Sequence, residues 1–178
     1  MLKDLLEKRQ SSRTYEQTHV PTEDILKCIQ AAQLAPSACN SQPWHFIVIN
    51  DPIIKKNLSD HVFNGPYQMN IFAKQAPVII ACVSEKTPLL LKTAGYLRRT
   101  PFYLIDIGIA MEHFVLQAQE LNLSTCWIGW FNERWARKIL EIPANKKIVC
   151  LLTLGYSREE HREKKRKNIK DIYSFNHY

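Results

Sequence analysis

The stretch that decides the fold is "APSACNSQPWHFIVI", residues 35–49, in which a proline and small polar residues lead through a Pro-Trp pair into an apolar run. The pattern predicts the end of a helix, then a polar loop, then the start of a strand. A loop that merely crosses a surface seldom needs a Trp and an Asn fixed against a strand. The stretch therefore indicates a loop with a binding role.

The elements expected around this loop alternate between helices and strands. Before it, residues 2–9 and 21–36 predict two amphipathic helices, the second with Thr22 as its N-cap and Pro36 at its end. After it, the expected order is strand 45–50, helix 52–62, buried strand 76–84, helix 102–121, strand and turn 124–131, helix 132–143 and buried strand 146–157, with residues 85–101 ambiguous. This order predicts a single α+β domain over residues 1–178, with helices around a mixed sheet.

The helix expected over residues 102–121 has little polar surface. Its apolar side chains point in almost every direction, as at Ile105, Ile107, Ile109, Met111, Phe114, Val115, Leu116 and Ala118. A helix that is apolar nearly all round must be buried. In a chain of 178 residues, a partner chain is the favoured cover. The aromatic residues of the C-terminal tail also need somewhere to bury.

Composition limits the class of protein. No run of about 18 apolar residues is present, which predicts no transmembrane helix. The charged segment at residues 1–13 lacks the apolar core of a signal peptide, so we expect a cytoplasmic protein. The five cysteines form no CxxC pair and the six histidines have no ligand spacing, which predicts no metal site. Asp106 and Glu112 are six residues apart and do not share a helix face, so no catalytic carboxylate pair is expected.

Positive charge gathers near both ends of a chain whose net charge is +7. Arg9, Ser11 and Arg13 alternate on one segment, and residues 164–167 read "KKRK". The chain has five glycines and neither GxGxxG nor GxxxxGK[ST], so side chains would have to hold any phosphate. The spacing of these residues alone favours charged side chains exposed to solvent over an anion-binding site, and both interpretations stay open.

Four segments, in order, resemble the nitroreductase family of flavin-dependent oxidoreductases. They are "RQSSRTY" (9–15), "AAQLAPSACNSQPWHFIVI" (31–49), "YLIDIGIAMEHFVLQAQELNLSTCWIGWF" (103–131) and "LLTLGYS" with the basic tail (151–157 and 164–167). Together they span nearly the whole chain. The resemblance implies a central mixed, mainly antiparallel sheet flanked by helices, with the long helix in the core of a homodimer. It also implies FMN at the dimer interface.

The same resemblance implies roles for particular residues. The FMN phosphate would be held by Arg9, Ser11, Lys164 and Arg166, and the N1/O2 edge of the ring would lie near Arg13. The flavin of the partner chain would be faced by Pro36, Ser37, Ala38 and Asn40. Flavin N5 would be approached by Gly129 and the backbone N–H of Trp130. Asn70 is a further candidate ring contact. No side chain need act as a catalytic acid, since the flavin carries the chemistry.

This chain departs from the family pattern at two positions. Gln10 replaces the usual second Arg near the ribityl or phosphate group, and Trp130 stands where many relatives have a small residue. Residues 85–101 vary within the family and are expected to shape the substrate site. The sequence leaves the role of Cys39 open.

The implied activity is transfer of hydride from NADH or NADPH, via flavin N5, to an electron-poor acceptor such as a nitroaromatic or a quinone. One alternative keeps the fold and FMN but assigns a specialised metabolite dehydrogenation or flavin reduction with poor nicotinamide turnover. A remote alternative is a basic nucleic-acid-binding domain, although no nucleic-acid-binding motif is evident. Neither a nucleic acid nor a membrane is expected as a partner.

Overall fold

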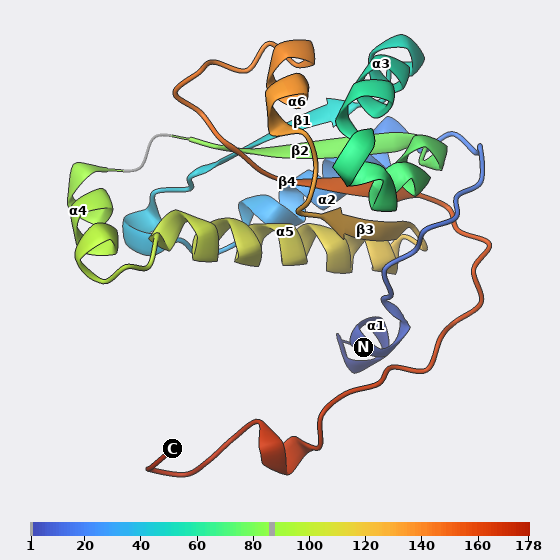
Figure 1. The fold of residues 1–178 in the computed structure, drawn as a ribbon. Helices are drawn as coiled ribbons and strands as arrows, with labels where there is room; N and C mark the ends of the chain where they lie inside the picture. The colour runs from blue at the N-terminus through green and yellow to red at the C-terminus, as the bar shows by residue number, and fades with distance from the viewer. Residues whose placement is uncertain (1, 86–87) are drawn as a thin grey trace.

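The structure, a computed structural model, describes residues 2–85 and 88–178. Helices and strands alternate much as the sequence predicts (Figure 1). Their bounds are α1 (Leu2–Lys8), α2 (Thr22–Gln33), the short 3-10 helix η1 (Ala38–Asn40), β1 (Trp44–Ile49), α3 (Pro52–Val62), η2 (Gly65–Gln75), β2 (Val78–Ser84), α4 (Leu89–Leu97), α5 (Phe102–Glu120), β3 (Ser124–Ile128), α6 (Glu133–Ile139), β4 (Ile148–Gly155) and η3 (Ile169–Asp171). The expected α+β fold is confirmed, and the ambiguous segment contributes α4.

The four strands form one sheet in the order β1-β2-β4-β3, and each neighbouring pair is antiparallel. Parallel pairing is confined, among the described residues, to an isolated bridge between Ser11 and Thr125. The sheet is therefore mainly antiparallel, as expected. In the central strand β2, residues 78–83 are all buried, which explains the continuous apolar run in the sequence.

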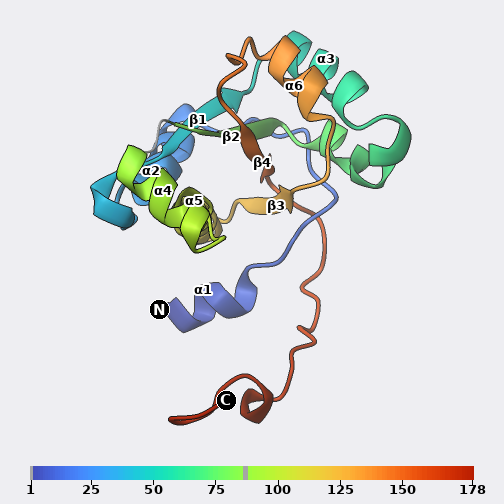
Figure 2. The same ribbon diagram turned by 60° about the vertical axis from the view of Figure 1, so that its left-hand side comes forward.

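Helices cover both faces of the sheet (Figure 2). Alternate residues of β2 point to opposite faces. Ile80 and Cys82 pack toward α2 and α5, whereas Ile79 and Ala81 pack toward α3, η2 and α6. The two cores hold the sheet rigidly between them, and the loops at the ends of α5 project from this scaffold.

Helix α2 begins differently from the expectation. Thr22 is the first helical residue and Pro21 precedes it as the cap, without a side-chain hydrogen bond. The carbonyl oxygen of Pro21 accepts the backbone N–H groups of Asp24 and Ile25, at 3.1 and 3.2 Å. The prediction of Thr22 as the N-cap was wrong because this backbone carbonyl already receives the N–H groups of the first turn.

Apolar surface remains uncovered in two places where burial was expected. Helix α5 buries one face, but Leu104 and Ile105 are 40% and 50% exposed. The tail runs apart from the body in both views, and Tyr173 and Phe175 are exposed (Figures 1 and 2). One chain alone therefore does not bury these groups. None of the helices in the described part of the chain is long and apolar enough to cross a membrane.

Candidate functional site

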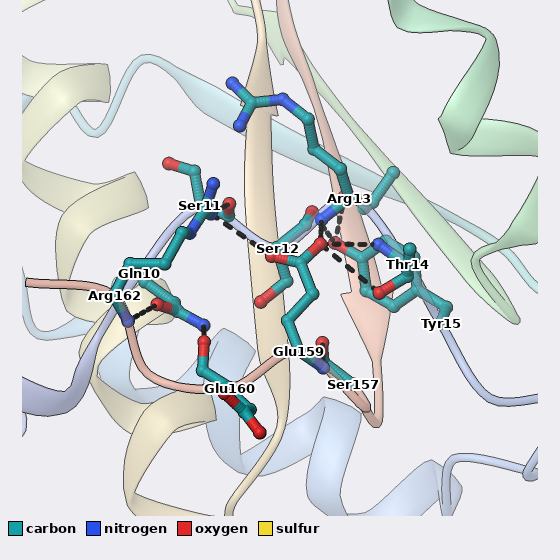
Figure 3. A network of polar contacts seen from close by, with 11 residues as sticks. Gln10, Ser11, Ser12, Arg13, Thr14, Tyr15, Ser157, Glu159, Glu160 and Arg162 are labelled. Carbon is teal, nitrogen blue, oxygen red and sulfur yellow. Dashed lines mark hydrogen bonds and ion pairs between the residues drawn. The ribbon is translucent and has the colours of Figure 1, made fainter.

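The N-terminal arm, residues 9–15, lies against the start of the C-terminal tail (Figure 3). One carboxylate oxygen of Glu159 accepts the backbone N–H groups of Arg13 and Thr14, at 2.5 and 2.8 Å. The Thr14 hydroxyl donates to the same oxygen at 3.3 Å. The Glu159 side chain is only 18% exposed. Charged acceptors form stronger hydrogen bonds than neutral ones, so this carboxylate fixes the backbone of the arm.

Gln10 extends this arrangement by using both ends of its amide. Its Nε2 donates to the carbonyl oxygen of Glu160 at 3.1 Å, and its Oε1 accepts the N–H of Arg162 at 3.0 Å. The Arg162 guanidinium donates to the carbonyl oxygen of Ser11 at 2.6 Å and pairs with Glu159 at 3.2 Å. The Gln10 amide, which the resemblance placed among the cofactor residues, is thus directed to the tail. We call Gln10, Glu159 and Arg162 the arm–tail clamp.

The clamp brings cations from both ends of the chain together. Lys164 donates to the carbonyl oxygen of Glu7, and its pKa is lowered by partial burial and by the positive charges of Arg9 and Arg166. Among the described residues, no carboxylate lies within 4 Å of the charged groups of these three cations. Glu7 and Glu112 act electrostatically on Lys164 and Arg9 from further away and balance the three cations only in part. Like charges held this close favour an anion in their midst. Their chemistry fits a phosphate group.

Arg13 presents its side chain away from the clamp. Only its backbone N–H binds Glu159 (Figure 3). The guanidinium carbon lies 5.8 Å from the centroid of the Phe72 ring. No carboxylate of the described residues pairs with this guanidinium, which leaves its N–H donors available to a ligand.

A buried network lies beneath the arm. The Tyr15 hydroxyl is 2.8 Å from the carbonyl oxygen of Ser12 and 2.6 Å from the Thr153 hydroxyl, which is itself 3.2 Å from the carbonyl oxygen of Cys126. Two hydroxyl protons serve three contacts, so one contact is always without a proton. Burial raises the pKa of Tyr15 well above its ordinary value. The network anchors the arm to β3 and β4, close to the Ser12 N–H bond to Thr125.

The turn after β3 packs against η2. Asn70 Nδ2 donates to the carbonyl oxygen of Trp130 at 2.7 Å, and the Trp130 indole N–H donates to the carbonyl oxygen of Pro66 at 3.2 Å. The indole also packs against the Tyr67 ring in a tilted arrangement, with the ring centroids 5.3 Å apart. Within the described chain, the backbone N–H of Trp130 has no hydrogen-bond partner. These contacts fix the large indole against η2 and leave that N–H free.

The loop of residues 36–40 is held from α5. Asp106, a buried residue, accepts the backbone N–H of Ala38 at 3.1 Å through Oδ1. Cys39 and Asn40 have φ values of 50° and 51°, a left-handed conformation that is uncommon for residues other than Gly. Ser37 Oγ accepts the N–H of Gln42 at 3.0 Å. The loop is therefore a strained but anchored structure, and Cys39 is exposed upon it.

The structure brings some of the expected site residues together and leaves others apart. Arg9, Ser11, Lys164 and Arg166 gather where the arm meets the tail. Loop 36–40 lies instead near the N-terminal end of α5, away from the arm's bridge to β3 (Figure 1). Within one chain, the cations of the arm and tail and the residues of loop 36–40 therefore do not form a single site.

Sequence reasoning missed three residues that build the site: Asp106, Glu159 and Arg162. A lone acidic residue on the buried face of an apolar helix is a usable signal for Asp106, because burying a carboxylate is costly unless it accepts a hydrogen bond. Glu159 and Arg162 lie in a charged tail that reads as solvated, and nothing in their spacing marks them.

The sequence profile of the nitroreductase family matches residues 6–68 and 69–156. A relative from Archaeoglobus fulgidus, named provisionally as an NADH dehydrogenase/NAD(P)H nitroreductase, is 34% identical over 158 residues, which are 85% of this chain and 83% of the relative. An oxygen-insensitive NADPH nitroreductase of Helicobacter pylori is 26% identical, covering 97% of this chain and 95% of its own.

A solved structure has the same fold over almost all of its length. The FMN-dependent nitroreductase of Clostridium difficile superposes with a TM-score of 0.75 at 30% identity, covering 98% of each chain. The profile covers most of the sequence, and the described fold agrees with it. The chain belongs to the nitroreductase family.

Proposed function

We propose that this chain is an FMN-dependent oxidoreductase that passes hydride from NADH or NADPH to an electron-poor acceptor, such as a nitroaromatic or a quinone. Membership of the family and relatives named as NAD(P)H and FMN-dependent nitroreductases support the enzyme class and the cofactor. One observation carries the proposal for this chain. Arg9, Lys164 and Arg166 come from opposite ends of the sequence and lie close enough for the two guanidinium charges to lower the pKa of Lys164, and no carboxylate of the described residues forms an ion pair with them.

The residues at the arm–tail contact would hold the phosphate of FMN. Arg9, Lys164 and Arg166 would bind it through charge-assisted hydrogen bonds, with Ser11 as a further donor. This replaces the glycine-rich loop that the chain lacks. The arm–tail clamp would fix the distance between the two sources of cations.

The residues further along the arm and turn would face the ring. When bound, FMN supplies the two-electron chemistry, accepting hydride at N5 and returning it to an acceptor. Arg13, with its unpaired guanidinium, would lie at the N1/O2 edge. The free N–H of Trp130, following Gly129, would donate toward N5. Asn70 would act chiefly by holding the Trp130 carbonyl.

The complete site would need two copies of the chain. Loop 36–40 does not meet the arm of its own chain, and Pro36, Ser37, Ala38 and Asn40 would line the flavin of the partner. The exposed Leu104 and Ile105 on α5 and the exposed tail aromatics supply apolar surface for such a homodimer. The proposal treats residues 1–178 as one domain of this dimer.

The test is the visible spectrum of the purified protein, with FMN added, before and after anaerobic NADH or NADPH. Flavin bands that bleach with either donor support the oxidoreductase. Bands that persist favour a specialised donor or a binding role instead. A protein that takes up no flavin contradicts the proposal, and nucleic-acid affinity that falls steeply with salt would then favour the remote alternative.

A further inference from the structure

A cavity of about 370 Å³ lies between α4 and the first turn of α5. Its walls are mainly apolar and include Leu91, Tyr96 and Phe102. Two cations, Lys92 and Arg99, also line it. This size and this mixture, an apolar body with a few polar groups, are typical of sites for small molecules.

Arg99 occupies a backbone position that usually belongs to glycine. Helix α4 ends in a Schellman motif, in which the N–H of Thr100 bonds to the carbonyl oxygen of Gly95 at 2.9 Å and that of Arg99 to Tyr96 at 3.0 Å. In this motif the residue after the C-cap must have a left-handed backbone conformation. Here that residue is Arg99, with a φ of 54°. Glycine adopts this conformation without strain, whereas a side chain does not. Asn122 and Glu141 occupy the same left-handed position after α5 and α6, but Arg99 also lines the cavity and so brings a positive charge to its wall.

The surroundings of the cavity are positively charged. Residues 88–105 contain Lys92, Arg98 and Arg99, and the nearest carboxylate that follows, that of Asp106, is buried and accepts the N–H of Ala38. Among the described residues, neither Lys92 nor Arg99 forms an ion pair or a side-chain hydrogen bond. Both guanidinium and ammonium groups are therefore available to an anion, next to a wall that suits an aromatic body.

The cavity lies beside the loop that we assign to the flavin. Phe102 and Asp106 are four residues apart and so share a face of α5, and Asp106 binds the N–H of Ala38. Both views place α4 and η1 at the same end of α5 (Figures 1 and 2). A molecule in the cavity would thus be near loop 36–40.

We propose that this cavity binds the electron acceptor, and that the acceptor is a planar apolar molecule bearing an acidic group such as a carboxylate. Arg99, helped by Lys92, holds the acidic group, while Tyr96 and Phe102 contact the planar body. The inference rests on the proposed function and adds a substrate class to it. The phosphate of a nicotinamide donor has related chemistry, and the test separates the two.

The experiment compares two ligands of similar shape, 4-nitrobenzoate and the neutral 4-nitrobenzamide, on the oxidised, FMN-loaded protein. Isothermal titration gives each Kd, and consumption of NADPH and of NADH gives each kcat/KM. We expect 4-nitrobenzoate to bind about five-fold more tightly, the scale of an exposed ion pair of about 1 kcal/mol. Reduction of 4-nitrobenzamide tests the proposed function separately, because it needs no anion site.

Three variants assign the effect. Arg99→Gln removes the charge but keeps the left-handed backbone, and we expect it to abolish the preference for the acid. Arg99→Gly should also abolish the preference for the acid. It should raise Tm by about 2 °C, because glycine adopts the left-handed conformation without strain. Arg98→Gln is the matched control: it removes the same charge from the neighbouring residue, which does not line the cavity, and should keep the preference.

The opposite results overturn the inference. Equal affinities for the two ligands, no binding of either, or an equal loss in Arg98→Gln and Arg99→Gln would each exclude a specific acid site. If Arg99→Gln changes only the ratio of NADPH to NADH turnover, the anion is the phosphate of the donor and not the acceptor. If 4-nitrobenzamide is not reduced with either donor, the proposed function fails as well.

Discussion

Asp106 Oδ1 accepts the backbone N–H of Ala38 at 3.1 Å, joining the buried face of α5 to a loop 68 residues earlier in the chain. The other oxygen, Oδ2, is buried without a hydrogen-bond partner among the described residues. The carboxylate is therefore retained at some cost in desolvation, and its visible benefit is the position of the loop.

Asp106→Ala should release this loop. We expect the Ala38 amide to exchange its hydrogen about ten-fold faster, because a hydrogen bond to a charged acceptor contributes about 1.5 kcal/mol. FMN affinity should fall as well. Hydrogen exchange resolved to residues 36–40 makes the measurement. Asp106→Asn keeps the accepting oxygen and should preserve most of the protection; equal exchange in wild type and Asp106→Ala would show that the bond does not anchor the loop.

Glu159 is the centre of the arm–tail clamp, and its removal should affect both stability and cofactor binding. Glu159→Ala leaves two backbone N–H groups without their acceptor. We expect a loss of about 1–2 kcal/mol in the free energy of unfolding, measured by urea denaturation, together with weaker FMN binding as Arg9 and Lys164 separate. The neighbouring Glu160→Ala is the matched control, because only the backbone oxygen of Glu160 joins the clamp. Similar losses in both variants would count against the clamp.

The lowered pKa of Lys164 predicts how FMN binding depends on pH. Partial burial, together with the positive charges of Arg9 and Arg166, lowers the pKa of Lys164 below the ordinary lysine value of 10.5. Phosphate affinity should therefore begin to fall at a lower pH than an ordinary lysine would allow. The folding stability of the FMN-free protein depends on pH in the opposite direction. The unfolded chain binds the Lys164 proton more tightly than the folded protein does, so the contribution of Lys164 to the free energy of unfolding increases as pH rises between the lowered pKa and 10.5.

Lys164→Arg distinguishes this explanation from general alkaline damage. Arginine keeps its charge throughout the accessible range, so the variant's Kd for FMN should remain nearly constant from neutral pH to about 10. Fluorescence titration of FMN at several pH values makes the comparison. Identical pH profiles for wild type and variant would remove Lys164 from the phosphate site.

Much of this fold could be predicted because burial follows local periodicity. The run over residues 76–84 has the composition of a strand buried on both faces, and Asp51-Pro52 marks the start of α3, where the Asp51 side chain accepts two N–H groups. The cap of α2 could not be predicted in the same way, because a backbone carbonyl of Pro21 serves the role expected of Thr22.

The site was less accessible to sequence reasoning, because its contacts join distant segments. The resemblance implied that Arg9 and Lys164 act together. The structure adds the contacts that bring them near each other: Gln10 and Glu159 bind arm to tail across about 150 positions of the chain, as in the Gln10 bond to Glu160. The resemblance placed Gln10 among the cofactor residues, with one positive charge fewer than the usual Arg. In the structure its amide binds two backbone groups of the tail.

Arg13→Ala tests the assignment at the ring edge. The guanidinium is held over Phe72 and forms no ion pair with a carboxylate in the described chain, so its N–H donors and its charge would be available to the cofactor. A fixed cation near N1/O2 favours the reduced, more negative form of the flavin. We expect the variant to have both a weaker hold on FMN and a lower midpoint potential. Arg13→Lys keeps a cation and should retain most of the potential. If both quantities are unchanged in Arg13→Ala, Arg13 does not occupy the ring edge, whereas a change in affinity alone would place it toward the phosphate.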